Sequence, residues 1–260
     1  MLQDVKWPED REYSTASDHE PLEFFTDALL HSTSINLLLG YFSFSAIHLL
    51  SMGFAKFIAR GGKLNVVAND VLSAGDKEIL EFAEEYKSTP KGAIDLSNLK
   101  ELKETLSERG KHFFNCVAYL MEQDRLGFVL VKPKNSSGIS HYKQGVLSDV
   151  KHKVCFSGSS NFTASGFQEN LESIDVYLEW ENSRSSKKIA NTSKLFEDIY
   201  SKKSEIVDYV ELENIRTQIA DEFGGHDLKQ LVEDERQIVK KYLSSIKSKS
   251  LVKKLQALEE

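Results

Sequence analysis

Short apolar runs alternate with helical patterns from Pro21 to about Lys202, and this alternation restricts the chain to a layered fold of strands and helices. The strand-like runs are Ser34–Phe42, Lys63–Ala68, 113–120, 126–133, 138–148, Lys153–Ser157 and Ser173–Leu178. Helical patterns cover Pro21–Leu30, Ala46–Arg60, Ser73–Tyr86, Ser97–Arg109 and Ser185–Tyr200, with Gly61-Gly62 and Gly110 as stop signals. We therefore expect an α/β sandwich in which helices flank a mixed central sheet.

The pattern changes after residue 203. Residues 204–258 contain no strand-like run, and Gly224-Gly225 separates two helical patterns. A chain of 260 residues is long enough for one main domain and an appendage. We therefore expect a main domain at 1–203 and a helical carboxy-terminal extension at 204–260.

Chemically active side chains gather between His141 and Glu172. His141 and Lys143 are two residues apart on an expected strand, so both point to one face and Tyr142 to the other. Ser159 and Asn161 stand in a Gly-Ser-x-Asn turn that ends the next expected strand. The segment after this turn is expected to open a helix whose amide groups favour an anion.

These side chains suit a phosphate diester that is handled without a metal. His141 can act as a nucleophile and Lys143 as a fixed positive charge. Ser159 and Asn161 can bind phosphate oxygens, and Glu172 can orient the histidine. A lone His-x-Lys or a lone Gly-Ser-x-Asn turn is common, so the signal lies in their order and spacing.

His141-x-Lys143, followed by Gly-Ser-x-Asn161 and then Asn170-x-Glu172, resembles the catalytic signature of the phospholipase D superfamily. The spacing is most similar to its single-motif nucleases, particularly the metal-independent restriction endonucleases of the BfiI and NgoFVII type. A weaker resemblance extends over about residues 20–205. One position departs from the pattern: the superfamily usually has an aspartate five residues after the lysine, where this chain has Ser148, followed by Asp149.

The resemblance implies a phospholipase D-like nuclease domain and a covalent phosphohistidine on His141. Lys143, Ser159 and Asn161 would stabilise the growing negative charge, and Glu172 would hold the imidazole. The leaving oxygen then needs a proton from a second histidine. The sequence contains no second His-x-Lys followed by Gly-Ser-x-Asn, so the resemblance implies a homodimer in which both His141 side chains share one site.

The remaining histidines and the cysteines have ordinary structural interpretations. His152 is expected to be an exposed hairpin residue, His112 a strand-edge residue and His48 a packing residue. Cys116 and Cys155 lie in apolar runs and are expected to be buried free thiols. Their spacing predicts no metal site, and the absence of a Gly-x-x-x-x-Gly-Lys-Ser/Thr loop predicts no nucleotide cofactor.

The net charge of −7 is unusual for a nucleic-acid-binding protein. Whether the chain can bind nucleic acid therefore depends on the local charge near the site. Lys151 and Lys153 lie near the motif in sequence and are candidate nucleic-acid contacts. Between Arg236 and Lys254 every charged residue is basic, and an apolar stripe runs at helical spacing. This segment packs on the main domain or its dimer mate, contacts the phosphate backbone, or does both. Its candidate contacts are Lys240, Lys241, Lys247 and Lys249.

The start of the sequence has no signal-peptide pattern, and its apolar runs are too short to cross a bilayer, so we expect a cytoplasmic protein without a membrane partner. The leading interpretation is a DNA endonuclease in restriction or anti-phage defence, whose cleavage is either weakly sequence-specific or directed by a partner such as a helicase or ATPase. A phospholipid-directed phosphodiesterase and a non-catalytic nucleic-acid-binding module of a defence complex are the alternatives. The recognition sequence and the choice between DNA and RNA, or between single and double strands, stay open.

Overall fold

The computed structural model describes residues 1–15, 17–40, 50–69, 99–134, 142–158, 173–211, 213–244 and 249–256. Within these ranges the chain forms one eight-stranded sheet with the order β1-β7-β6-β5-β2-β3-β4-β8. The strands are β1 (Glu12–Ser14), β2 (Ser34–Leu39), β3 (Lys63–Asn69), β4 (Leu126–Pro133), β5 (Lys143–Ser148), β6 (Lys153–Gly158), β7 (Ser173–Leu178) and β8 (Val207–Val210). The expected α/β architecture with a mixed central sheet is confirmed.

The sheet combines a parallel half with an antiparallel half. β2, β3 and β4 run parallel, whereas β5 pairs antiparallel with β2 and is followed by antiparallel β6, β7 and β1. β2 lies in the middle and has apolar side chains on both faces, which is typical of a strand covered from both sides. Ile35, Leu37 and Leu39 join one cluster, and Leu38 joins the other.

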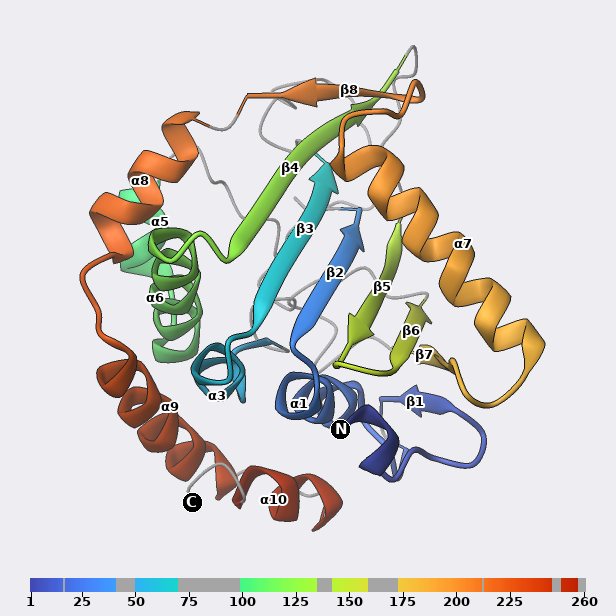
Figure 1. Ribbon diagram of the computed structural model, residues 1–260. Coiled ribbons are helices and arrows are strands. Elements are labelled where there is room, and N and C mark those ends of the chain that lie inside the picture. Colours follow the sequence, from blue (N-terminus) through green and yellow to red (C-terminus); the bar gives the residue numbers. More distant parts are fainter. Residues whose placement is uncertain are drawn as a thin grey trace, which may run out of the picture.

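Helices cover the two faces unequally. α7 (Ser183–Tyr200) packs on one face, and α1 (Pro21–His31), α3 (Phe54–Ala59) and α6 (Glu108–Glu122) pack on the other (Figure 1). α9 (Leu228–Leu243) and α10 (Lys249–Gln256) lie outside these three helices, and α8 (Glu213–Phe223) lies beside α6. A single turn of 3-10 helix (Leu2–Asp4) and α5 (Leu99–Thr105) complete the described elements.

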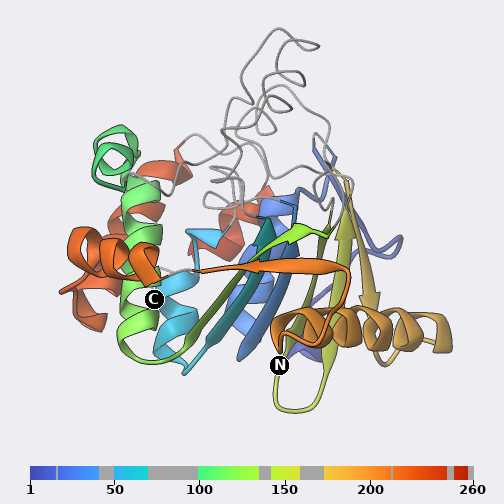
Figure 2. The same ribbon diagram turned by 90° about the horizontal axis from the view of Figure 1, so that it is seen from above.

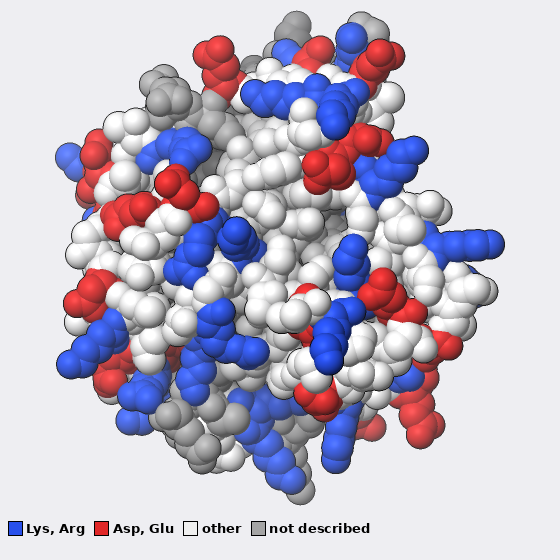
Figure 3. All heavy atoms as spheres, viewed as in Figure 1, with Lys and Arg blue, Asp and Glu red and all other residues white. Residues whose placement is uncertain are grey.

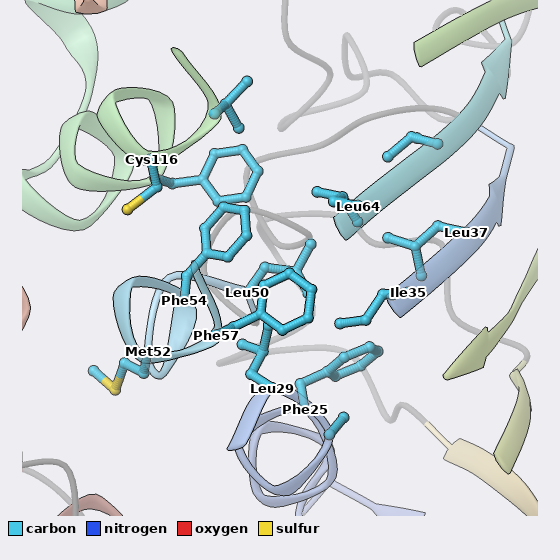
Figure 4. Packing of buried hydrophobic residues seen from close by; sticks show 14 of the residues in the cluster. Phe25, Leu29, Ile35, Leu37, Leu50, Met52, Phe54, Phe57, Leu64 and Cys116 are labelled. Atoms are coloured by element: carbon cyan, nitrogen blue, oxygen red, sulfur yellow. The ribbon is translucent and has the colours of Figure 1, made fainter. Parts of the chain in front are cut away.

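The main core lies between β2, β3 and the three inner helices. Figure 4 shows Phe25 and Leu29 of α1 and Phe57 of α3 on the side of Ile35, Leu37 and Leu64 of the strands, with Phe54 of α3 and Cys116 of α6 in the layer farther from the sheet. The Phe54 and Phe113 rings stack at 5.3 Å between centroids. Burial of this many large apolar side chains is the main favourable term in folding.

The expected strand at 113–120 is wrong, because these residues form the middle of α6. Ser107 caps the helix by accepting a hydrogen bond from the Gly110 amide at 3.2 Å, so Gly110 lies inside α6 rather than after a helix. α6 is surrounded by the sheet, α3, α8 and α9, and apolar residues therefore occur around most of its circumference. A helix buried in this way produces a continuous apolar run that resembles a buried strand.

Two helix predictions need further correction. The segment expected as one helix at Ala46–Arg60 is interrupted at Ser51–Gly53, where Gly53 adopts a φ of 88° and precedes α3. The segment expected as one helix at Ser97–Arg109 is divided between α5 and the start of α6. His112, expected at a strand edge, is buried in α6, where its Nε2 lies 3.4 Å from Glu235 Oε2.

Residues after 203 contribute to the same sheet and the same core. The expectation that 204–258 contain no strand is wrong for β8, which pairs antiparallel with β4. The apolar stripe of the carboxy-terminal helices packs inward, as Ile238, Val239 and Leu251 are buried in the main core. The ammonium group of Lys254 binds Glu23 Oε1 at 2.7 Å and also contacts Asp27, which ties α10 to α1.

Some expectations fall on residues outside the described ranges. These are the helix at Ser73–Tyr86, the helix expected to open after Asn161, and the parts of the predictions at 46–49 and 138–141. Both cysteines are buried free thiols, as expected, Cys116 in α6 and Cys155 in β6. No helix among the described residues is long and apolar enough to cross a membrane.

Glu235 joins α9 to α3, and its removal should destabilise the protein. Its buried Oε2 accepts a hydrogen bond from the Ala55 amide, in the first turn of α3, at 2.8 Å. Glu235→Ala would leave this amide unpaired at a cost of about 2 kcal/mol. We expect the Tm in differential scanning calorimetry to fall by roughly 4–8 °C.

Glu233→Ala is the matched control, because Glu233 lies on the same helix with its side chain 52% exposed. Its Tm should stay within about 2 °C of wild type. Equal Tm values for the two variants would show that the contact between Glu235 and Ala55 contributes nothing.

Candidate functional site

The segments that carry the predicted catalytic residues are attached to strand ends that meet at one edge of the sheet. β5 begins at Lys143, directly after His141-Tyr142, and β6 ends at Gly158, directly before Ser159. β7 begins one residue after Glu172. Antiparallel pairing places Gln144 opposite Ser157, and Gly158 opposite Ile174, so all three strand ends lie together.

Of the predicted site residues, Lys143 lies within the described ranges. His141, Ser159, Asn161 and Glu172 lie outside them, and the structure describes only the strand ends next to their segments. Among the described residues, no three His, Cys, Asp or Glu side chains are grouped as a metal site would require.

The same edge carries the carboxyl ends of the parallel strands. Leu39 of β2 stands opposite Lys143 on one side and Ala68 of β3 on the other, and Ala68 stands opposite Leu130 of β4. The arrowheads of β2, β3 and β4 point to one end of the molecule, and the β5–β6 hairpin lies at the other end (Figure 2). In open α/β sheets, ligands bind outside the carboxyl ends of the strands.

Lys143, Leu39, Ala68 and Leu130 form one row of paired residues across the four strands, and this row also shows on which face of the sheet Lys143 stands. Leu39, Ala68 and Leu130 are all buried in the main core, so Lys143 belongs to the face covered by α1, α3 and α6. Tyr142 packs with Leu38 and its neighbours on the α7 face. Lys143 is half-buried, as expected for a side chain at the rim of a core.

α1 directs its amino terminus toward this edge. Only Ser32 and Thr33 separate the end of α1 from the start of β2, so the helix returns along the sheet. The Phe24 and Phe25 rings pack on Phe156 of β6, with centroids 5.4 and 5.2 Å away. A helix amino terminus carries a partial positive charge, which favours an anion at the edge.

Strand β5 approaches its neighbours closely because position 145 is glycine. A Cβ at Gly145 would stand 2.6 Å from a ring carbon of Phe156 and 2.9 Å from the carbonyl oxygen of Asn36. The backbone contact leaves little room for adjustment, because Asn36 belongs to the paired strand β2. The aromatic contact between α1 and β6 therefore depends on a glycine two residues from Lys143.

His19 is a histidine at this edge that sequence reasoning did not select. Its carbonyl oxygen accepts a hydrogen bond from the Ser14 amide at 2.9 Å, and Ser14 pairs with Ser173 at the start of β7. Its Nδ1 lies 3.7 Å from Glu23 Oε2. Three strand spacings separate β1 from β5, or about 14 Å. Nothing in the sequence around His19 indicated this position, because it depends on the pairing of β1 with β7.

The predicted basic contacts are spread over distant parts of the structure. Lys153 stands opposite Ser148 at the far end of β5, about 17 Å from Lys143, and Lys151 lies in the adjoining turn. Lys240 is exposed on α9, and the Lys241 ammonium binds Glu108 at 2.7 Å. Lys249 lies in α10, and Lys247 lies outside the described residues.

Asp149 has a structural role at the edge opposite Lys143. Its Oδ1 accepts hydrogen bonds from the Lys151 and His152 amides at 2.7 and 2.8 Å, and its Oδ2 accepts one from the Leu2 amide at 2.6 Å. Burial opposes ionisation of this carboxyl group, but the backbone hydrogen bonds outweigh it and hold the pKa of Asp149 below its usual range. Asp149 thus closes the β5–β6 turn and attaches the start of the chain to it.

Three solved structures align with this chain at low sequence identity and low TM-score. A phospholipase D family member, Nuc from Salmonella typhimurium, aligns with a TM-score of 0.42 and 14% identity over 77% of this chain and 96% of that chain. Polyphosphate kinase from Porphyromonas gingivalis aligns with a TM-score of 0.40 and 12% identity over 88% of this chain and 31% of the kinase.

The third structure is TrmBL2, an archaeal chromatin protein described as having a novel mode of DNA binding. It aligns with a TM-score of 0.36 and 11% identity over 80% of this chain and 57% of that chain. No protein-family model and no curated protein sequence matches this chain. At such identities and TM-scores the likenesses carry no conclusion about activity.

Asp149→Asn should reduce stability in a pH-dependent way. The pKa of Asp149 is lowered in the folded state, so its contribution is fully present above the unfolded pKa of about 3.9 and is lost as the pH falls below it. Urea unfolding at pH 7 should show a loss of about 2 kcal/mol. The difference from wild type should shrink below about pH 4.

Asp221→Asn, an exposed position on α8, is the control and should follow wild type at both pH values. A difference between Asp149→Asn and wild type that persists unchanged at pH 3 would contradict an ionised Asp149 in the turn.

Proposed function

We propose that this chain is a metal-independent phosphodiesterase that cleaves DNA through a covalent phosphohistidine. The observation that supports this proposal is the convergence of three strand ends, the start of β5, the end of β6 and the start of β7, at one edge of the sheet. The His-x-Lys, Gly-Ser-x-Asn and Asn-x-Glu sequences are attached to these ends. In this proposal a nucleophile, phosphate ligands and an orienting carboxylate act together at this edge.

Each residue has one role in the proposed reaction. The neutral imidazole of His141 attacks phosphorus and forms a phosphorus–nitrogen bond, while the bond to the leaving oxygen breaks. Lys143, Ser159 and Asn161 bind the nonbridging oxygens as negative charge grows. Glu172 accepts a hydrogen bond from the second ring nitrogen and leaves the first free to attack. Water then hydrolyses the phosphohistidine and regenerates the imidazole.

The leaving oxygen must be protonated, and the described histidines do not supply the donor. His19 lies at the candidate edge but about 14 Å from β5, and His152 lies in the turn at the opposite edge. General acid catalysis needs a donor within hydrogen-bond distance of the leaving atom. The resemblance to single-motif nucleases implies a twofold homodimer, and in our proposal His141 of the second protomer protonates the leaving oxygen.

A role in restriction or anti-phage defence fits a nuclease of this kind, with a helicase or ATPase partner to direct cleavage. The nucleic-acid contacts proposed from sequence, at Lys151, Lys153, Lys240, Lys241, Lys247 and Lys249, belong to this proposal as well. Hydrolysis of phospholipid vesicles without cleavage of DNA would favour the lipid-directed alternative. DNA binding without any cleavage would favour the non-catalytic binding module.

Cleavage in excess EDTA tests the proposal directly. Wild type should cut plasmid or single-stranded DNA with EDTA present, because no metal takes part in the proposed reaction. His141→Ala and Lys143→Ala should each lose at least about 10³-fold in rate, because they remove the nucleophile and a charge-stabilising group. His226→Ala, which changes a histidine between α8 and α9, is the control. Equal rates for wild type and His141→Ala would refute the mechanism.

The shared site can be tested with mixed dimers. Wild-type and His141→Ala chains carrying different affinity tags would be refolded together, and the heterodimers would be purified through both tags. If each reaction needs both histidines, the heterodimers should be almost inactive. Two independent sites would instead leave about half of the wild-type activity.

A further inference from the structure

The β1 end of the candidate edge is acidic, whereas the β4 end carries two lysines beside the exposed acidic residues of β8 and its flanks, Glu205, Asp208 and Glu211. On the β1 side, the exposed side chains of Glu12, Asp18 and Asp175 are acidic, and Glu12 pairs with Asp175 across the strands. On the β4 side, Lys132 and Lys134 are exposed. The strand order places the start of β5, with the proposed phosphodiester site, between these two ends. A long polyanion that occupies the site is therefore repelled from β1, and Lys132 and Lys134 are the cations that can bind it on the β4 side.

Lys132 stands on the same face of the sheet as Lys143. Leu130 lies in the row that contains Lys143, and Lys132 follows Leu130 by two residues, so it projects on the same side. It lies about 7 Å further toward the carboxyl ends of the strands. Three strand spacings separate β4 from β5, or about 14 Å, which gives a total separation of roughly 16 Å from Lys143.

Lys132 and Lys134 are available to bind an anion. Within the part of the chain that the structure describes, no ion pair engages either of these two ammonium groups, whereas Lys103, Lys241 and Lys254 are held by carboxylates. Asp208 stands opposite Lys132 in β8 and is the acidic residue nearest in register, but no ion pair joins the two. The Lys134 amide donates to the Ile206 carbonyl at 2.9 Å, which fixes the backbone that carries this charge.

We infer that Lys132 and Lys134 bind the phosphates of a nucleic-acid strand that runs from the proposed site across β2, β3 and β4. A separation of about 16 Å corresponds to roughly five nucleotide steps of one duplex strand, at 3.4 Å per step. A single phosphodiester or a phospholipid headgroup is too small to reach both places. This inference rests on the proposed function and makes the substrate a polymer of several nucleotides, selected by contacts distant from the reacting phosphorus.

Phosphate contacts could instead lie at the opposite edge of the sheet, where β5 ends and β6 begins. Lys151 and Lys153 lie near the catalytic motif in sequence but at the far end of β5. The face drawn in Figure 3 shows Lys and Arg gathered left of and below an uncharged centre, with most of the Asp and Glu toward the rim. This face can therefore also attract a polyanion, and a binding experiment has to distinguish the two places.

Binding of a fluorescein-labelled 20-nucleotide DNA, single-stranded and as a duplex, tests the inference without requiring cleavage. Anisotropy would be measured over a series of salt concentrations in a His141→Ala background. Lys132→Ala/Lys134→Ala should weaken single-strand binding about tenfold and reduce the salt slope by about 1.4, the value for two lost phosphate contacts. Lys187→Ala/Lys194→Ala on α7 removes the same charge from an exposed helix and is the control.

Lys151→Ala/Lys153→Ala is the competing variant. The inference is wrong if Lys151→Ala/Lys153→Ala weakens DNA binding and reduces the salt slope while Lys132→Ala/Lys134→Ala changes neither. It is equally wrong if the parent protein binds neither form of the DNA at low salt, or if all three double variants weaken binding equally.

Hydrolysis separates a failure of the inference from a failure of the proposed function. In the otherwise wild-type chain, Lys132→Ala/Lys134→Ala should lower the ratio of kcat/KM for the 20-nucleotide strand to that for bis-p-nitrophenyl phosphate by about tenfold. An unchanged ratio overturns the inference and leaves the proposed function intact. If the wild type hydrolyses neither compound, the proposed function fails, and the binding experiment still decides whether Lys132 and Lys134 contact DNA.

Discussion

The antiparallel pairing of β5 with β2 is the constraint on which the candidate site depends. It joins the parallel strands β2, β3 and β4 to the antiparallel strands β5, β6 and β7 with Leu39 opposite Lys143. This register brings the carboxyl ends of the parallel strands to the edge where β5 begins, β6 ends and β7 begins. A slip by one residue would turn Lys143 toward α7 and Tyr142 toward α1, because side chains alternate along a strand. The contact of Gly145 with Phe156 and with the backbone of β2 opposes such a slip.

Much of the sheet could be predicted from sequence, because its central strands are short, apolar and bounded by turn residues. β2, β3, β6 and β7 are of this kind. α6 could not, since a helix buried on most sides loses the polar face that distinguishes it from a strand. β8 could not either: four residues are too few for a periodic signal, and its place in the sheet depends on β4, which lies more than 70 residues earlier in sequence.

The spacing of residues in the sequence selected the candidate catalytic residues, but it did not show which charged side chains lie near Lys143 in the fold. Lys143 and Lys153 are ten residues apart, and the sequence alone grouped them, whereas the hairpin places them at opposite edges of the sheet. Lys132 and His19 reach the edge of Lys143 only through pairings between distant strands. Asp149 is displaced by one residue from the aspartate of the superfamily pattern, and in the structure its carboxyl group binds backbone amides of the turn far from Lys143. Long-range register thus decides which charges can act together.

The hydrogen bond between the Leu2 amide and Asp149 has a practical consequence for handling the protein. It anchors the first residues of the chain beside the β5–β6 turn, at the edge remote from Lys143. An affinity tag or surface linker attached before Met1 therefore leaves the molecule on the side away from the candidate site. Protein immobilised through such a linker would present the carboxyl ends of β2, β3 and β4 to the solution. The fold thus offers an orientation for single-molecule or surface-binding measurements that needs no change to the residues near the candidate site.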